Sequence, residues 1–335
     1  MKFRKWNQRI GIIVAFTLVL VGMTGCATSD KKTDDAELTE LTVLLDWYPN
    51  AVHTFLFAAQ EQGYFEEEGL DVKLQTPADP NDALKLVATG KADLALSYQM
   101  QVAIARSEDI PIVSVAAIVR HPINQLFALQ SAGVQRPNDL IGKKIGYPSS
   151  PLDEAIVNTM VQTDGGDPSK LQYVDVGWDL IPAMTTNKVD AIIGGFVNHE
   201  KLLLEKEGEQ LTVLEPSKFG VPDYYELVMT ASEEGLDRKT DAIQKFMKAA
   251  IKGQEYTVQH PDEALQVLLN KQEKESPLDA DIEKQSLAIL LPLMDAGSEP
   301  FGTQSEQSWS SVIEWLTKHQ ILKKEVKADQ AFRNL

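Results

Sequence analysis

Apolar runs alternate with helical patterns through most of the chain. The run at 41–45 ends in a polar and aromatic turn, and apolar positions from Phe55 then recur at helical spacing until Gly63. Further apolar runs follow at 70–74, 92–97, 112–119, 126–130, 144–147, 171–176, 190–194 and 211–214. Strands that alternate with helices predict an α/β protein with mostly parallel sheets flanked by helices.

The alternation begins again near Gln125, and from Asp237 the pattern becomes mainly helical. A first unit, a second unit and a helical tail predict two lobes joined by two crossings, with a ligand cleft between the lobes. The predicted helices of the tail are 240–258, 261–271, 279–293 and 305–318. We expect the crossings near 121–126 and 226–231, lobe 1 at 41–123 plus 230–335, and lobe 2 at 124–229.

The first 25 residues have the composition of an export signal. Basic residues precede an apolar stretch at 10–21, and small residues then lead to Cys26, the single cysteine of the chain. This arrangement resembles a bacterial lipobox, although Met23 replaces the usual leucine, and it implies lipidation at Cys26. The alternative is an ordinary signal peptide with an incidental cysteine. The polar segment at 26–40 is expected to be a flexible tether.

The charge balance limits the partners of the chain. The net charge is −17, and removal of the basic export segment would make it more negative. An acidic body argues against nucleic acid and against anionic lipid surfaces, so membrane attachment would depend on acyl chains. The histidines show no metal-ligand spacing, and we expect neither a metal nor a cofactor.

The turn after the first strand carries the clearest candidate site. It contains Asp46, Trp47, Tyr48 and Asn50, with His53 in the following helix. Side chains at the carboxyl end of a strand in an α/β protein are well placed to bind a ligand. None of these residues is a nucleophile or part of a metal cage, so we expect a binding surface.

Several motifs resemble those of type II periplasmic-type solute-binding proteins. They are Gly-Tyr-Phe-Glu at 63–66, Glu-Gly-Leu-Asp-Val at 68–72, Gly-Lys-Ala-Asp at 90–93 and Pro-Asn-Asp-Leu-Ile-Gly-Lys-Lys-Ile-Gly-Tyr at 137–147. The turn at 46–50 with His53 is similar to the thiamin-pyrimidine branch of that family, which includes the ThiY-type formylaminopyrimidine-binding lipoproteins. The resemblance implies a two-lobed type II periplasmic-binding-protein fold.

The resemblance also implies a role in uptake. Proteins of this branch deliver N-formyl-4-amino-5-aminomethyl-2-methylpyrimidine, a thiamin breakdown product, to the permease and ATPase subunits of an ABC importer for salvage. We accordingly expect an extracytoplasmic monomer, lipid-anchored on the outer face of the bacterial cell membrane. Another small ligand remains an alternative, for example a nucleobase, riboflavin or a sulfonate.

An enzymatic function is a less favoured hypothesis. The same branch contains the thiamin-pyrimidine synthase, whose pyridoxal-phosphate lysine and substrate histidine correspond by resemblance to Ser97 and Gln101. Without a lysine there is no Schiff base, and without an imidazole there is no donor. No nucleophile motif or paired metal ligands support a hydrolase. We therefore expect a protein that is not an enzyme.

A small aminopyrimidine needs flat faces for its ring and polar groups for its edge. Candidates for the faces are Trp47, Tyr48, Tyr98, Trp178 and Tyr225, although packing alone would also explain each ring. Candidates for the polar contacts are Asp46, Asn50, His53, Ser149, Asn198 and Glu226. Asp46 could instead cap a helix, His53 could be structural, and Glu226 could be a solvated loop carboxylate.

Two further predictions follow from position. Asp153 and Glu154 lie just inside the helix that begins after Ser150, and acids at a helix N-terminus disfavour a bound anion. A neutral or cationic ligand is therefore expected. Trp309 and Trp315 lie on the helical pattern of the tail and are expected to belong to the core.

Overall fold

The computed structural model describes residues 38–77, 82–148, 150–177, 179–272 and 277–335. The predicted export signal, the tether and lipidation at Cys26 lie outside these residues. All described residues belong to one compact unit, Glu37–Leu335. Within the described ranges, no helix has the length and apolar character needed to cross a membrane.

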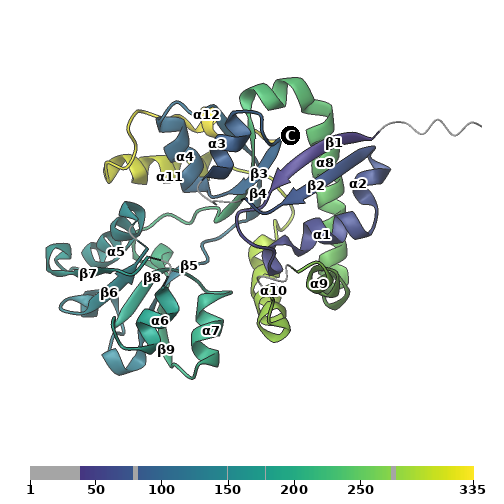
Figure 1. The fold of residues 1–335 in the computed structure, drawn as a ribbon. Coiled ribbons are helices and arrows are strands. Elements are labelled where there is room, and N and C mark those ends of the chain that lie inside the picture. Colours follow the sequence, from purple (N-terminus) through teal and green to yellow (C-terminus); the bar gives the residue numbers. More distant parts are fainter. Residues whose placement is uncertain (1–37, 78–81, 149, 178, 273–276) are drawn as a thin grey trace, which may run out of the picture. The chain divides into compact units, whose positions relative to one another are not determined.

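The first sheet, called sheet A, combines the first four strands with the last one (Figure 1). Its strands are β1 (Thr39–Leu44), β2 (Leu70–Gln75), β3 (Leu94–Ser97), β4 (Ile112–Val119) and β10 (Leu227–Ser232). Their order is β2-β1-β3-β10-β4, with β1 parallel to both β2 and β3. Every residue of β4 is buried, in agreement with its continuous apolar run.

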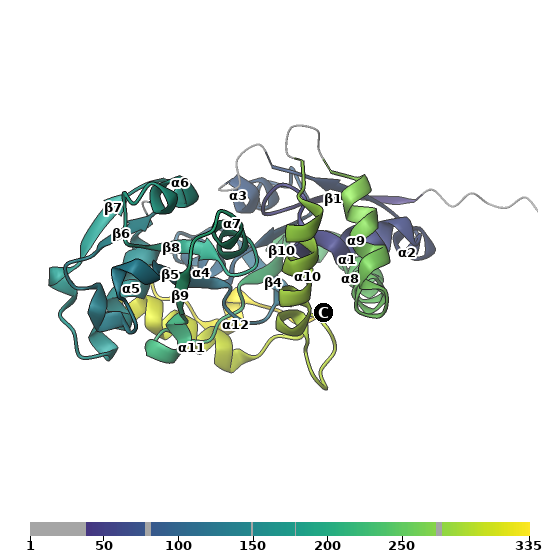
Figure 2. The ribbon, with the colours of Figure 1, turned by 90° about the horizontal axis from the view of Figure 1, so that it is seen from below.

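Helices from both ends of the chain accompany sheet A. The N-terminal ones are η1 (Ala51–His53), α1 (Thr54–Glu61), α2 (Tyr64–Glu67), α3 (Ala83–Ala88) and α4 (Gln99–Ser107). The C-terminal ones are α8 (Glu233–Gln259), α9 (Pro261–Asn270), α10 (Ala280–Met294), α11 (Glu306–Lys318) and α12 (Ala328–Ala331). Figures 1 and 2 both show α1 beside α8 and α9, and α10 beside α9.

The contact between α1 and α8 depends on a glycine. A Cβ atom at Gly253 of α8 would lie 2.2 Å from the carbonyl oxygen of Phe55 and 2.7 Å from the Cβ of Ala59. Both of these residues belong to α1, so glycine lets the two helix backbones approach closely. This packing fixes the helix that follows the predicted ligand turn.

The second sheet, called sheet B, contains the five remaining strands. They are β5 (Asn124–Leu129), β6 (Lys144–Tyr147), β7 (Gln172–Asp175), β8 (Ala191–Phe196) and β9 (Leu211–Leu214), in the order β7-β6-β8-β5-β9. The α-helices between these strands are α5 (Pro151–Thr163), α6 (Leu180–Thr185) and α7 (Glu200–Lys206). Short 3-10 helices occupy Gln130–Ala132, Pro137–Leu140, Pro168–Lys170 and Pro216–Phe219.

The α/β class is confirmed, and each sheet is mixed. In sheet A, β10 is antiparallel to β3 and β4, while in sheet B, β5 is antiparallel to β8 and β9. Both reversals involve strands next to the connections between the sheets, which run from β4 to β5 and from β9 to β10. The predicted assignment of residues to two lobes remains a prediction.

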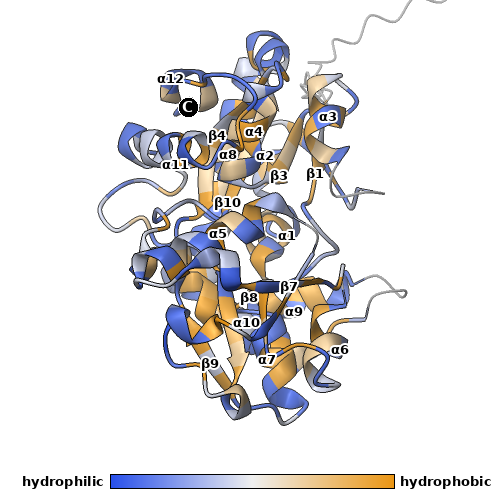
Figure 3. Cartoon of the chain, turned by 90° about the vertical axis from the view of Figure 1, so that its left-hand side faces the viewer, coloured by the Kyte–Doolittle hydropathy of each residue, from blue (hydrophilic) through white to orange (hydrophobic). Residues whose placement is uncertain are grey.

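The core agrees with the hydrophobic pattern. In Figure 3 the strands of both sheets are mostly in hydrophobic colours, whereas several helices carry a hydrophilic face. The large side chains that are fully buried include Trp309, Phe55, Phe127 and Phe246. Trp315 is also buried, so the prediction that Trp309 and Trp315 belong to the core is confirmed.

Candidate functional site

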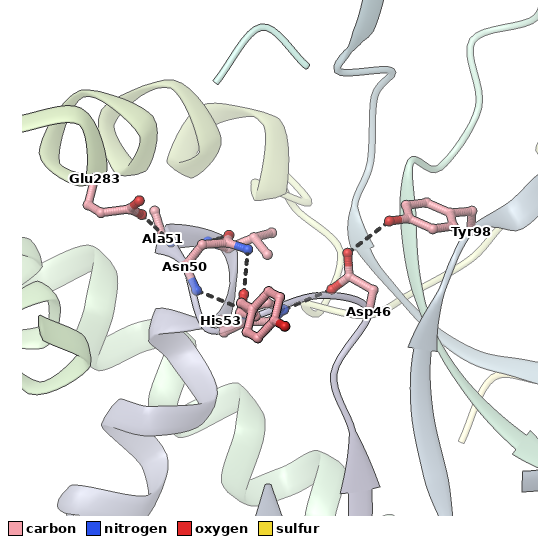
Figure 4. Close-up of polar contacts among 8 residues, drawn as sticks. Asp46, Asn50, Ala51, His53, Tyr98 and Glu283 are labelled. Atoms are coloured by element: carbon pink, nitrogen blue, oxygen red, sulfur yellow. Dashed lines mark hydrogen bonds and ion pairs between the residues drawn. The ribbon is translucent and has the colours of Figure 1, made fainter. Parts of the chain in front are cut away.

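A buried carboxylate organises the turn that follows β1. Asp46 is 8% exposed, and its two oxygens have different partners. The ring Nε2 of His53 donates to Oδ1 at 2.8 Å, and the Tyr98 hydroxyl donates to Oδ2 at 2.9 Å (Figure 4). Because Tyr98 directly follows β3, this carboxylate connects the ends of two neighbouring strands of sheet A.

The hydrogen bonds of the His53 ring indicate which of its nitrogens carries the proton facing Asp46. The backbone N–H of Asn50 donates to Nδ1 of His53 at 3.1 Å, so the other ring nitrogen carries the proton that points to Asp46. Burial raises the pKa of Asp46, but the hydrogen bond from His53, the electrostatic interaction with His53 and the hydrogen bond from Tyr98 outweigh it and leave this pKa lowered. Burial and the neighbouring Asp46 raise the pKa of Tyr98 well above its usual value. The turn therefore holds an ionised carboxylate between two hydrogen-bond donors.

Asn50 shapes the turn from within. Its side-chain oxygen accepts from the N–H of Val52 at 3.1 Å, and its amide nitrogen donates to the carbonyl of Tyr48 at 3.0 Å. These bonds satisfy backbone groups at the start of η1, as a helix cap does. In this structure both Asn50 and His53 therefore position the turn, and direct ligand contact by either residue stays a prediction.

Two aromatic rings lie on the outside of the turn. Trp47 is 41% exposed and Tyr48 is 42% exposed, whereas Asp46 and His53 of the same segment are buried. The rings of Trp47 and Tyr48 meet edge to face, with centroids 5.8 Å apart. An exposed aromatic ring next to buried polar groups in the sequence offers a flat apolar face to a planar ligand.

A glutamate far along the chain holds the same turn. Glu283 of α10 is buried, and its Oε2 accepts from the N–H of Ala51 at 2.7 Å (Figure 4). Burial raises the pKa of Glu283, opposed by this N–H and by the nearby rings of His199 and His53. Sequence reasoning missed Glu283. The sequence feature that could have identified it is its position on the apolar face of the predicted helix, together with Ile282, Leu287 and Leu290.

Sheet B reaches this region through the end of β8. The ring of Phe196 lies 6.4 Å from the ring of Tyr98, centroid to centroid. Two residues further, Asn198 is 5% exposed, and its amide nitrogen donates to the Ser286 hydroxyl of α10 at 3.0 Å. Asn198 is thus linked to the region of Asp46 through Phe196 and through α10, and its contact with a ligand stays a prediction.

The predicted residues near the second crossing have partners of their own. Tyr225 is buried, with its N–H bonded to Gln99 and its hydroxyl bonded to Ser305, and the Arg120 guanidinium lies 5.5 Å from its ring centroid. Glu226 is not a solvated loop carboxylate, because it is 5% exposed. One of its oxygens accepts from the backbone N–H groups of Ile123 and Asn124 at 2.9 and 3.0 Å.

Glu226 belongs to a pair of buried acids joined by Asn124. The amide nitrogen of Asn124 donates to Asp153 at 3.2 Å, and its amide oxygen accepts from the N–H of Gly194 at 3.0 Å. Burial raises the pKa of Glu226 to about 7, against its two backbone hydrogen bonds, and Asp153 adds to the rise. Burial also raises the pKa of Asp153 to about 6. Glu226 therefore joins the two connections between the sheets, and Asp153 joins the start of β5 to α5.

Two of the predicted ligand contacts, Ser149 and Trp178, lie outside the described residues. Ser150 occupies the N-cap of α5, but its side chain makes no capping hydrogen bond there. The structure therefore brings Asp46, Trp47, Tyr48, Asn50, His53 and Tyr98 together, with Asn198 attached through α10. It places Tyr225 and Glu226 at the connection before β10.

A surface hollow of about 420 Å³ lies away from this cluster. It is lined by residues around Gly90 and by the first turns of α8. Its charged groups already pair with one another, as Lys239 does with Asp93 and Arg238 does with Glu234. The network at the end of β1 is therefore the better candidate for recognition.

The two mixed sheets with their flanking helices place the chain among proteins with a periplasmic-binding-protein fold. The periplasmic aliphatic sulphonate binding protein SsuA from Escherichia coli superposes with a TM-score of 0.70 over 87% of this chain and 96% of its own. Its sequence identity is 13%, so this likeness concerns the fold alone.

The sequence comparisons define the family. The model of the family described as NMT1/THI5 like matches residues 50–264, and the chain belongs to this family. The formylaminopyrimidine-binding protein of Halalkalibacterium halodurans is 43% identical over 96% of this chain and 98% of its own length. The 4-amino-5-hydroxymethyl-2-methylpyrimidine phosphate synthase of Legionella pneumophila is 28% identical over 69% of this chain and 73% of its own. The family thus contains both a named binding protein and named enzymes.

Proposed function

We propose that this chain is the substrate-binding component of an ABC importer and that it captures N-formyl-4-amino-5-aminomethyl-2-methylpyrimidine for thiamin salvage. The observation that carries the proposal is the nearly full-length similarity to a protein named for binding a formylaminopyrimidine. The exposed Trp47–Tyr48 pair, next to buried polar groups in the sequence, supports it, because a planar polar ring requires both kinds of surface.

The buried charges favour this ligand over a sulfonate. Asp46 and Glu283 hold the turn from within, and Glu226 lies near enough to raise the pKa of Tyr98. A sulfonate would bring a further negative charge into this acidic region, whereas an aminopyrimidine brings N–H donors. The likeness to SsuA is a likeness of fold and does not favour sulfonate binding here.

Binding without turnover is part of the proposal. Some family members are named as synthases, but Ser97 and Gln101 occupy the positions that resemblance gives to the lysine and histidine of such an enzyme. Ser97 is buried at the end of β3, and neither side chain forms a Schiff base. Ligand recovered unchanged after long incubation supports a binding protein. A modified product would support the enzymatic alternative.

We further propose that the protein functions outside the cytoplasm, as a monomer attached to the membrane through lipid on Cys26. The support is the export-signal pattern that ends at this cysteine and the acidic composition, which offers no basic surface for anionic lipid. Metabolic labelling with a fatty-acid analogue should label the wild type and should not label a Cys26→Ser variant. Absence of label in the wild type, or equal labelling of the variant, would contradict attachment at this residue.

The direct test is a fluorescence titration of the purified protein with the formylaminopyrimidine. Trp47 is exposed while Trp309 and Trp315 are buried, so ligand stacked on Trp47 should quench mainly the long-wavelength part of the emission. We expect saturable quenching with a dissociation constant that is micromolar or tighter.

Matched variants locate the site. Trp47→Ala should weaken binding about tenfold or more, because a stacked aromatic surface is lost. Tyr64→Ala removes a partly buried aromatic ring from α2, which lies in a separate hollow with Lys252, and should leave affinity unchanged. A loss of no more than about twofold in Trp47→Ala would count against this pocket.

A further inference from the structure

Asn198 carries an unusual buried atom. Its amide nitrogen is bonded to Ser286, but within the part of the chain that the structure describes its amide oxygen has no hydrogen-bond partner and is screened from solvent. Buried polar atoms nearly always have a partner, so an exception of this kind requires an explanation.

The orientation of the amide decides which of its two groups has the partner. With the NH₂ group on the Ser286 hydroxyl, the nitrogen has an acceptor and the amide oxygen is the group left without a partner.

The position of Asn198 links this deficit to the ligand site. Phe196, two residues before it, lies against Tyr98, which donates to Asp46. Ser286, its partner on α10, is one helical turn from Glu283, which holds the ligand turn through Ala51. Among the described residues, the other buried side-chain atoms without a partner lie in Gln254 of α8 and Trp315 of α11.

We propose that the amide oxygen of Asn198 accepts a hydrogen bond from a neutral N–H donor on the ligand's side chain, and that Ser286 holds the amide in position. This inference rests on the proposed function, where the corresponding donor is the formamide N–H. A neutral carbonyl suits a neutral donor, whereas a protonated amine would be attracted to carboxylates such as Glu283. Asn198 would thereby select pyrimidines that carry an acylated aminomethyl group.

Asn198 and Ser286 belong to different halves of the structure. Asn198 follows a strand of sheet B, whereas Ser286 belongs to a helix of the C-terminal part that accompanies sheet A. Binding proteins of this general kind close around ligands by hinge motion. A ligand admitted while these two residues are apart would meet the amide oxygen when they come together.

The test compares two ligands on the same protein. One is N-formyl-4-amino-5-aminomethyl-2-methylpyrimidine, and the other is 4-amino-2,5-dimethylpyrimidine, which keeps the ring and its amine but lacks the side-chain donor. Calorimetry should show that the wild type binds the first ligand about tenfold to a hundredfold more tightly than the second. Without a side-chain N–H donor on the ligand, the buried amide oxygen stays unpaired, which costs binding free energy. Asn198→Ala should lose most of this preference through weaker binding of the first ligand only.

Two further variants complete the design. Ser286→Ala should reduce the preference at least about threefold, because the amide is no longer held, and it serves as the second variant if Asn198→Ala does not fold. Asn270→Ala alters an exposed asparagine of α9, bonded to Gln266, and should change neither affinity. Thermal unfolding of each variant establishes that it is folded.

The outcomes separate the two proposals. Equal affinity of the wild type for both ligands would overturn the role of Asn198 and leave the pyrimidine assignment intact. If Asn198→Ala lowers the affinity for both ligands equally, the role of Asn198 is also overturned. The residue would then support the site without recognising the side-chain N–H donor. Failure of the wild type to bind either ligand would contradict the proposed function itself.

Discussion

Glu226 should make the stability of this protein depend on pH in a way that one substitution removes. Its carboxyl group is buried between the two connections that join the sheets, where it accepts the N–H groups of Ile123 and Asn124. Glu226→Gln keeps an oxygen that can accept these bonds and removes the ionisation. The comparison therefore isolates the cost of the buried charge.

The size of the effect follows from the pKa. Burial raises the pKa of Glu226 from 4.5 to about 7. Since each unit corresponds to about 1.4 kcal/mol, ionisation in the folded state costs about 3 kcal/mol. The folded protein binds more protons than the unfolded chain between these two values. The free energy of unfolding should therefore fall as pH rises through this window and level off above pH 7.

The assay is urea unfolding at about pH 5 and about pH 8. Relative to the wild type, Glu226→Gln should gain about 2–3 kcal/mol in free energy of unfolding between these two conditions. The difference between proteins cancels the contributions of titrating groups that do not interact with Glu226. An exposed carboxyl provides the control, and Glu299→Gln should follow the wild type at both pH values. If Glu226→Gln also follows the wild type, Glu226 is not the group that titrates and the reasoning fails.

Two further substitutions test the packing and the hydrogen bonds behind the ligand turn. Gly253→Ala should lower the free energy of unfolding by about 1–3 kcal/mol, because its Cβ would meet the carbonyl oxygen of Phe55. Urea titration measures this, and a Glu255→Ala variant on the exposed side of the same helix should change by less than about 0.5 kcal/mol. Tyr98→Phe removes one of two donors to a charged carboxylate and should cost about 1.5–3 kcal/mol. It should also shift acid unfolding to higher pH, because the pKa of Asp46 would be lowered less. Unchanged acid unfolding in Tyr98→Phe would show that this bond does not stabilise the ionised form.

Local sequence patterns predicted the local structure well. The apolar run at 41–45 corresponds to β1, and the helical spacing that ends at Gly63 corresponds to α1, with Gly63 at a positive φ of 74°. The helical tail also agrees, except that α8 begins at Glu233, before the predicted start at 240, and has non-helical dihedral angles at Lys239. These features depend on interactions between residues close in sequence, which periodicity and turn chemistry report directly.

The composition of the site could be predicted only in part. The turn after β1 was identifiable, but the bond of Asp46 to Tyr98, directly after β3, depends on the strand order, which no local pattern specifies. Glu283 is more remote still, because its bond to Ala51 joins residues separated by 232 positions. The alternative that Glu226 is a solvated loop carboxylate is wrong, because the side chain is 5% exposed, and a sequence does not reveal that a connecting segment is buried. Contacts between residues so far apart in sequence can be identified only once the fold is known.

The central claim is that this chain binds a formylated aminopyrimidine and leaves it unchanged. Isothermal titration calorimetry of the purified protein with N-formyl-4-amino-5-aminomethyl-2-methylpyrimidine, and separately with a short alkanesulfonate, tests it most directly. The account predicts one-to-one binding of the pyrimidine with a micromolar or tighter dissociation constant, no heat with the sulfonate, and recovery of intact pyrimidine. Folded protein that gives no heat with the pyrimidine, or that binds the sulfonate instead, would contradict the account.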